Sequence, residues 1–337
     1  MAPAISPSSA LAAQQSAAML SAPMLSAPML SGPTLAAPTL SARSADPLTY
    51  AQEIAPLWTQ PFAQLLLSQV PTLGKSTVLD VMCRAGEAGL ALVRRSPQTR
   101  LVAIDPSSAL LGLARQSAGS LLGRRVFLRA EPGQPKLPFD SEVYDLVLSN
   151  LGLLDVADPR RFLRELLRVA KPGASVLATV PLRDSFAEFH DLLGRAVGHR
   201  PREAALLEQG RNSLPDALTL YSWALEAGLE DVAIVTQPFS LLFAGGPDFF
   251  FSPLIARGPL SVWLPAFGER DEERQAVFTE LCGAIDRVAG GDAAGSSGAS
   301  FVVTIRAACL RARRAPPPPP LSFDDDPEHA PTRPGGF

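Results

Sequence analysis

The sequence predicts an α/β fold with a central, mostly parallel sheet of seven strands and helices on both faces. Short runs rich in β-branched residues alternate with stretches of helical periodicity across most of the chain. The runs are continuously apolar, as strands are when helices cover both faces of their sheet. Apolar residues make up 47% of the 337 residues, which is enough for a large core.

Five predicted strands and three predicted helices follow one another in the first half of this region. The strands are residues 77–81, 101–104, 126–128, 145–149 and 175–180, and the helices are residues 86–95, 108–120 and 159–170. The third helix has Pro159 near its start and Lys171, Pro172 and Gly173 after its end, which is typical helix punctuation. A fourth helix over 214–228 begins near Pro215 and ends at a glycine.

The chain divides into a domain, residues 46–314, and two tails. Residues 1–45 contain a five-residue repeat with a proline in each unit and no charged side chain before Arg43, so we expect a disordered low-complexity tail. A transit peptide is the alternative, although such peptides are normally rich in arginine. Residues 315–337 are rich in proline and acidic side chains, and we expect either a solvated tail or a docking segment for a protein partner.

Charge and composition exclude several function classes. The net charge is −3, which predicts neither a nucleic-acid interface nor an anionic membrane surface, and no apolar run is long enough to span a bilayer. The three cysteines are far apart and there are only three histidines, so no metal site is predicted. Cysteine usage favours a reducing compartment. The expected location is therefore the cytoplasm, with an organelle as the alternative if residues 1–45 are a targeting segment.

Polar residues and glycine follow the predicted strands where each strand ends. Asp80 and Gly86 belong to the segment at the end of the first strand, Asp105 follows the second, Glu131 the third and Asn150 the fourth. In open parallel sheets, ligands bind outside the carboxyl ends of the strands. These residues therefore mark the candidate ligand site.

The order of these segments resembles the class I S-adenosylmethionine-dependent methyltransferases that act on small molecules. That family writes its first motif as a strand followed by D-x-G-x-G-x-G, and this chain has D-V-M-C-R-A-G from Asp80 to Gly86. The segment L-P-F before the fourth strand, at 137–139, and R-E-L-L-R-V-A-K-P-G, at 164–173, also match the family pattern. The resemblance covers roughly residues 73–181 and implies the Rossmann-like fold of that family.

The resemblance implies S-adenosylmethionine as the cofactor. Asp105 would accept hydrogen bonds from the ribose hydroxyls, Asp80 would help to orient the amino-acid part, and Glu131 would contact the adenine side. The candidate cofactor-binding residues are Asp80, Met82, Arg84, Gly86, Asp105, Glu131 and Asn150, and no catalytic residue is assigned. Each acid also has a structural alternative: Asp105 would cap the next helix, Asp80 would pair with an arginine, and Glu131 would be an ordinary loop acid.

The chain departs from the family at two glycine positions, which Met82 and Arg84 occupy. A side chain at a position that needs positive φ costs on the order of 1–2 kcal/mol. Arg84 would also place a cation near the positive sulfonium, unless it pairs with the cofactor's carboxylate. In a second interpretation, Met82 fills an empty pocket and Arg84 points to solvent.

The second half of the domain resembles the last part of the family's sheet. Residues 231–243 and 301–310 resemble its final antiparallel strand pair, and residues 242–300 form an insertion between them with a helix over 269–288. Phe249 to Phe251 and Trp263 would either line a substrate pocket under a lid or pack the insertion onto the sheet. His190 or His199 would be a general base in the first case and a surface or packing residue in the second.

Two hypotheses follow. The first is an S-adenosylmethionine-dependent methyltransferase acting on a small molecule, which the retained Asp80, Gly86 and Asp105 support. The second is a catalytically inactive relative that serves as a scaffold or a regulatory partner, which Met82, Arg84 and the tails support.

Overall fold

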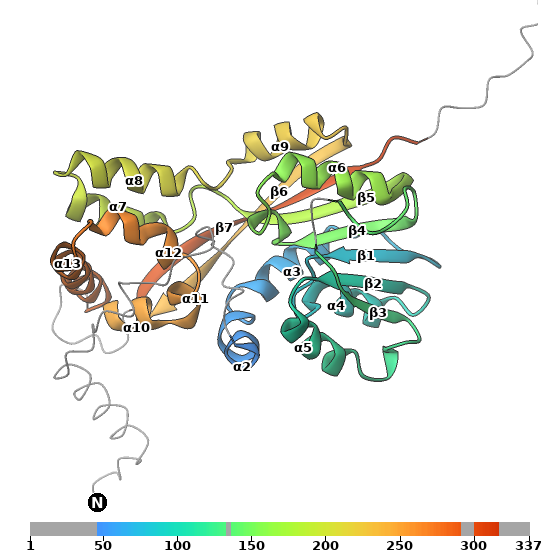
Figure 1. Ribbon diagram of the computed structural model, residues 1–337, viewed down its shortest axis with the longest axis horizontal. Coiled ribbons are helices and arrows are strands. Elements are labelled where there is room, and N and C mark those ends of the chain that lie inside the picture. Colours follow the sequence, from blue (N-terminus) through green and yellow to red (C-terminus); the bar gives the residue numbers. More distant parts are fainter. Residues whose placement is uncertain (1–45, 133–135, 291–299, 317–337) are drawn as a thin grey trace, which may run out of the picture.

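A computed structural model describes residues 46–132, 136–290 and 300–316 of the chain (Figure 1). The two predicted tails lie outside the described residues, apart from Ala315 and Pro316. Within the described part of the chain, no helix is long and apolar enough to cross a membrane.

The core of the fold is one sheet of seven strands in the order β3-β2-β1-β4-β5-β7-β6. The strands are β1 (Thr77–Val81), β2 (Arg100–Asp105), β3 (Val126–Ala130), β4 (Tyr144–Asn150), β5 (Ala170–Pro181), β6 (Glu230–Phe243) and β7 (Phe301–Arg313). The first five are parallel, and β7 runs antiparallel to both β5 and β6. This order confirms the predicted fold class, including the antiparallel pair at the end of the chain.

Helices cover both faces of the sheet (Figure 1). One face carries α3 (Thr59–Ser68), α4 (Glu87–Arg95) and α5 (Ser108–Ala118), and the other carries α6 (Pro159–Val169) and α9 (Ala217–Glu226). Two separate apolar clusters result, one on each face. The short helix α2 (Pro47–Thr49) and the π-helix η1 (Tyr50–Ile54) lead into α3.

Side-chain caps explain where the helices begin. Ser107 accepts a hydrogen bond from the amide of Leu110 at the start of α5, and Asp158 accepts one from Arg161 at the start of α6. These contacts satisfy amides that have no partner inside the helix. At the start of α4, by contrast, Gly86 is the N-cap with a φ of 82° and lies outside the helix, so the predicted helix began one residue too early.

The start of β5 differs from the prediction because of contacts with neighbouring strands, which local sequence patterns do not show. The turn predicted at 171–173 lies within β5, because Ala170 already pairs with Tyr144 before the ladder shifts register. Gly173 has a φ of 77°. Its amide donates a hydrogen bond to the main-chain carbonyl of Arg314, just after β7, at 3.0 Å. The neighbouring strands therefore extend β5 backward past the proline.

A helical region covers the far end of the long β6–β7 pair (Figure 1). It comprises α7 (Ala187–Val197) and α8 (Pro201–Arg211), which follow β5, and the segment between β6 and β7. That segment contains α10 (Gly246–Phe251), α11 (Pro253–Ala256), α12 (Leu260–Trp263), the 3-10 helix η4 (Leu264–Phe267) and α13 (Asp271–Gly290). The pairing from Pro238 with Arg306 to Phe243 with Phe301 runs beyond the end of β5, so the helices pack onto two strands alone.

Candidate functional site

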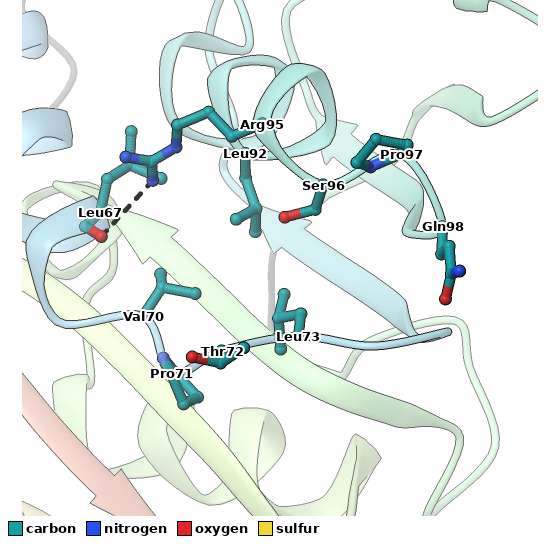
Figure 2. A pocket seen from close by; sticks show the side chains of 10 residues that line it. All are labelled: Leu67, Val70, Pro71, Thr72, Leu73, Leu92, Arg95, Ser96, Pro97 and Gln98. Carbon is teal, nitrogen blue, oxygen red and sulfur yellow. Dashed lines mark hydrogen bonds between the residues drawn. The ribbon is translucent and has the colours of Figure 1, made fainter.

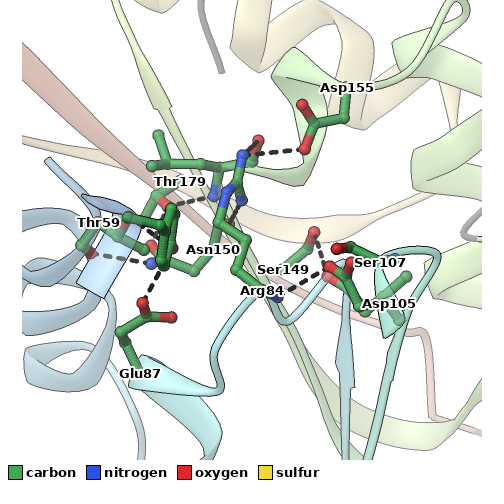
Figure 3. Close-up of polar contacts among 12 residues, drawn as sticks. Thr59, Arg84, Glu87, Asp105, Ser107, Ser149, Asn150, Asp155 and Thr179 are labelled. Atoms are coloured by element: carbon green, nitrogen blue, oxygen red, sulfur yellow. Dashed lines mark hydrogen bonds and ion pairs between the residues drawn. The ribbon is translucent and has the colours of Figure 1, made fainter. Parts of the chain in front are cut away.

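The carboxyl ends of β1, β2 and β4 meet at one edge of the sheet, and polar side chains gather there (Figure 3). Asp105 is the last residue of β2 and Asn150 the last residue of β4, while Arg84 lies in the loop after β1. All three are buried. The structure therefore brings these predicted site residues together; we refer to this cluster, with Asp80 and Asp155, as the strand-end site.

The loop after β1 keeps a glycine-like backbone although two of its glycine positions carry side chains. Met82, Arg84 and Gly86 have φ values of 59°, 54° and 82°. Left-handed backbone at a residue with a Cβ costs on the order of 1–2 kcal/mol. Met82 and Arg84 thus store strain at the site, at the positions where the family pattern has glycine.

The side chain of Arg84 is fully buried and crosses from the β1 loop to the segment after β4 (Figure 3). Nη1 donates to the carbonyl of Asn150 at 2.6 Å, and Nη2 donates to the carbonyl of Leu151 at 3.3 Å. Nη2 also forms an ion pair with Asp155 at 2.9 Å, where the carboxylate side chain is 5% exposed. The interpretation in which Arg84 points to solvent is therefore wrong.

The carboxylate of Asp105 binds the loop itself. Oδ2 accepts from the amide of Arg84 at 2.9 Å, and Oδ1 accepts from the amide of Ser107 at 2.8 Å. The second contact supports Ser107 as it caps α5, so the predicted capping role has a counterpart in the structure. Its predicted contact with ribose stays a prediction.

The two other acids lie apart from that contact. Asp80 is fully buried under α4, where one oxygen accepts from the amide of Gly89 at 3.0 Å. Burial raises the pKa of Asp80 to about 7, although that hydrogen bond acts in the opposite direction. Glu131 is partly exposed and pairs with Arg129 at 2.7 Å, as an ordinary loop acid does.

Asn150 turns its side chain away from the β1 loop. Its amide donates to the carbonyl of Thr59 at 3.0 Å and its oxygen accepts from the hydroxyl of Thr179 at 2.7 Å, so it connects β4 with α3 and β5. Only its main-chain carbonyl contacts Arg84.

Sequence reasoning missed Asp155, Tyr50 and Glu87. The hydroxyl of Tyr50 donates to Glu87 at 2.9 Å beside the β1 loop, and burial raises the pKa of Glu87. Asp155 lies five residues after Asn150 and is the C-cap of the 3-10 helix η3 (Gly152–Leu154). No motif marks these residues; the only available signal was an acid shortly after the fourth strand.

The strand-end site does not fit the amino-acid part of S-adenosylmethionine in this arrangement. Arg84 takes the space beside its glycine position, and Met82, 4% exposed, packs against the turn after β4. The packing there is so close that a Cβ on Gly152 would lie 2.1 Å from Oγ of Ser149 and 3.2 Å from Cβ of Met82. The chain's own side chains fill the place where the family motif provides bare backbone.

Cavities lie elsewhere on the domain. One of about 590 Å³ lies at the opposite edge of the sheet, between the segment before β1 and the end of α4 (Figure 2). Another of about 560 Å³ lies on the outer side of the β1 loop, between η1, α3, α4 and α5. Neither includes Arg84, Asp105 or Asn150 in its lining.

The aromatic residues of the helical region form a packed core. Phe249 is fully buried, and its ring stacks on Trp263 at a centroid distance of 6.1 Å while Phe189 lies 4.4 Å from Trp263. We refer to Phe189, Phe249, Phe250, Trp263 and Phe301 as the aromatic core. Of the two predicted roles for the aromatics, the structure supports packing of the insertion onto the sheet.

The two histidines lie in or near this region and away from the strand-end site. His190 accepts a hydrogen bond from Nε1 of Trp263 at 3.0 Å, and burial lowers the pKa of His190 to about 4. It is a neutral packing residue. His199 is exposed in the turn after α7. Among the described residues, no group of three acidic, histidine or cysteine side chains is placed to hold a metal.

Comparisons with known proteins point to one family. Residues 78–173 match the sequence profile of a family described as a methyltransferase domain. The chain is 26% identical over 180 residues to the demethylmenaquinone methyltransferase of Shouchella clausii, which covers 50% of this chain and 76% of that protein. It is 27% identical over 177 residues to the same enzyme of Bacillus cereus, with 49% and 73% covered.

Two solved structures are similar at low identity. The YcgJ protein of Bacillus subtilis is 17% identical with a TM-score of 0.47, covering 76% of this chain and 98% of its own. Phosphoethanolamine N-methyltransferase 2 of Haemonchus contortus is 14% identical with a TM-score of 0.46, covering 82% of this chain and 57% of its own.

Proposed function

Because the chain belongs to the class I S-adenosylmethionine-dependent methyltransferases, we propose that it transfers a methyl group to a small molecule once Arg84 has left the strand-end site. S-adenosylmethionine is the methyl donor of the family. Arg84 has to move first, because its side chain is buried in the strand-end site. No catalytic residue is part of the proposal, because neither histidine lies at the site.

One observation carries the proposal. The β1 loop keeps its left-handed backbone at Met82 and Arg84 despite the strain, and the carboxylate of Asp105 holds that loop through the amide of Arg84. Strained backbone of this kind is concentrated at ligand-binding and catalytic sites. The retained geometry therefore supports a site that still binds the cofactor.

The relatives suggest the first acceptor to assay. Demethylmenaquinone is the acceptor named for the proteins of Shouchella clausii and Bacillus cereus, and their matches cover about half of this chain. The helical region is outside the part matched by the family profile. Its sequence is thus where acceptor choice would differ from those relatives.

A second candidate function rests on Arg84. Its buried ion pair with Asp155 satisfies the site without any ligand, which is what a catalytically inactive scaffold or regulatory partner requires. Such a protein would need no cofactor for its fold, because Arg84 itself occupies the strand-end site.

Calorimetry on the full chain separates the two candidates. S-adenosylmethionine and its demethylated product, S-adenosylhomocysteine, are titrated into the native chain and into the double variant Met82→Gly/Arg84→Gly. The methyltransferase proposal expects saturable binding of both ligands at one site per chain, at least in the double variant. No binding by either chain at millimolar ligand would overturn it and favour the scaffold.

A further inference from the structure

We propose that Arg84 is an internal plug that competes with the cofactor's amino-acid part, so that Asp155 controls access to the site. The proposal rests on the proposed function, since the ligand class is that of the family. It goes beyond it by assigning a regulatory contact to two residues of this chain.

The groups that contact the Arg84 guanidinium are all hydrogen-bond acceptors. Its guanidinium meets two carbonyls, of Asn150 and Leu151, and the carboxylate of Asp155. All three are acceptors, and the place therefore suits a cation that donates hydrogen bonds. The amino-acid part of the cofactor ends in an ammonium group, which is a cation of this kind, so plug and ligand satisfy the same acceptors.

The plug is attached at both ends to strained backbone. Arg84 has a φ of 54° at one end, and Leu151, whose carbonyl it contacts, has a φ of 62° at the other. Neither residue is glycine, so each conformation has a cost that the plug's contacts offset. Strained residues of this kind cluster at active sites, ligand clamps and switch regions.

The guanidinium lacks a complete set of partners. Nε of Arg84 is buried with no hydrogen-bond partner among the described residues. A buried donor without an acceptor disfavours the arrangement in which the Arg84 side chain lies in the site. Water would accept this hydrogen bond if the side chain moved into solvent. The ion pair with Asp155 is the only contact of the guanidinium with a charged side chain that the described residues show within 4 Å, and it is the one that a substitution can remove.

The first test compares two ligands that differ only in the amino-acid part. S-adenosylhomocysteine has it, and 5′-methylthioadenosine has the same nucleoside and thioether without it. We expect Arg84→Gly to raise the affinity for S-adenosylhomocysteine about tenfold or more, within the usual range for coupled sites, and the affinity for 5′-methylthioadenosine less than about threefold. Equal gains for both ligands, or a loss for S-adenosylhomocysteine, would overturn the plug.

The second test uses the sign of one substitution in two backgrounds. In the native chain, Asp155→Asn loosens the plug and should raise the affinity for S-adenosylhomocysteine. In the Arg84→Gly chain the same change removes the negative charge that would pair with the ligand's ammonium group, and it should lower the affinity. A loss in both backgrounds would show that Asp155 does not control access.

A matched control is Arg125→Gly. The guanidinium of Arg125 also donates to main-chain carbonyls, among them Val93 at 3.1 Å and Pro97 at 3.0 Å, but at the opposite edge of the sheet. This variant loses a comparable side chain and should leave the affinity for both ligands unchanged. Its melting temperature shows how much of any effect is general destabilisation.

A third readout does not depend on the cofactor. Methylguanidinium at millimolar concentration should raise the melting temperature of Arg84→Gly, by filling the place that the guanidinium left, and should not raise that of the native or Arg125→Gly chains. If no chain binds S-adenosylhomocysteine while methylguanidinium stabilises only Arg84→Gly, the proposed function is wrong. The acceptors around Arg84 would still be a cation-binding site. If methylguanidinium has no selective effect and the ligand affinities do not change, the plug is overturned.

Discussion

The strand-end site, where the sequence predicts a cofactor, and the aromatic core, where a substrate pocket was one of two alternatives, are filled by side chains of different kinds. Apolar rings fill the aromatic core, where Phe249 packs against five neighbouring aromatic side chains. A charged side chain fills the strand-end site, on a backbone with positive φ at Met82, Arg84 and Leu151. The first filling consists of apolar contacts alone, whereas the second includes one oppositely charged partner, Asp155, beside two main-chain carbonyls.

Physical chemistry explains why the difference matters. Apolar packing gains free energy with every buried atom and has no specific partner to lose. A buried ion pair gains little over apolar residues of the same size, but removing one of its members is costly. Only the charged filling is therefore suited to be displaced by a ligand.

Phe249→Ala should have the largest effect on stability. The ring is fully buried, and its removal leaves a cavity between α10 and the β6–β7 pair. We expect the free energy of unfolding to fall by about 3–5 kcal/mol, measured by urea denaturation. The affinity for S-adenosylhomocysteine of the folded variant should not change. Leu218→Ala, at a position 73% exposed on α9, serves as the control with little effect.

An effect of Phe249→Ala below about 1 kcal/mol would contradict the comparison, because the aromatic core would then be loosely packed and open to a ligand.

Asp155→Ala should rank second. It leaves the buried cation of Arg84 with carbonyl partners alone, and we expect a loss of about 3 kcal/mol in the free energy of unfolding. The exposed ion pair of Arg160 and Glu226, whose side chains are 50% and 52% exposed, is the control: Glu226→Ala should cost less than about 1 kcal/mol.

The decisive comparison adds Arg84→Gly to Asp155→Ala. Removing the stranded cation should restore part of the lost stability, because no buried guanidinium then lacks its carboxylate. Additive losses in the double variant would mean that the two side chains do not act as a pair.

Asp80→Asn tests the second buried charge of the strand-end site through pH. The folded pKa is raised to about 7 from 3.8, so between about pH 4 and 7 the folded chain holds a proton that the unfolded chain releases. The free energy of unfolding therefore falls as pH rises through this window. Asparagine cannot ionise, so the variant should not lose stability through this window and should gain, relative to the native chain, between pH 4 and pH 8.

Urea denaturation at both pH values measures this gain. Asp216→Asn is a control of opposite sign, because hydrogen bonds from Thr219 lower the pKa of Asp216 and its contribution is lost on acidification. If Asp80→Asn leaves the pH dependence of stability unchanged, Asp80 is not a source of it.

The fold was largely predictable from the sequence. Which side chains fill the strand-end site was not. The strands after which Asp80, Asp105 and Asn150 stand are local patterns, and the sheet order follows from their resemblance to one family. The strained backbone at Met82 and Arg84 was predictable too, because the motif requires glycine at those positions.

The direction of the Arg84 side chain was not predictable. Its contacts with Asn150 and Asp155 lie 66 and 71 residues away along the chain, and no local pattern connects them. The same holds for His190 and Trp263, which are 73 residues apart. A long side chain points where tertiary contacts allow, and those depend on how the loop after β1 meets the turn after β4.

The smallest expected effect belongs to Gly86→Ala, which tests whether the β1 loop still needs its third glycine. Gly86 has a φ of 82°, and a Cβ there would lie 3.0 Å from Cδ1 of Leu90. Alanine should therefore cost about 1–2 kcal/mol through backbone strain and crowding. Gly112→Ala is the matched control, because it lies within α5 with open space at its Cβ and should stabilise the chain slightly. A neutral result for Gly86→Ala would mean that the loop adapts to side chains at all three positions, and the strain at Met82 and Arg84 would then no longer distinguish the strand-end site from the aromatic core.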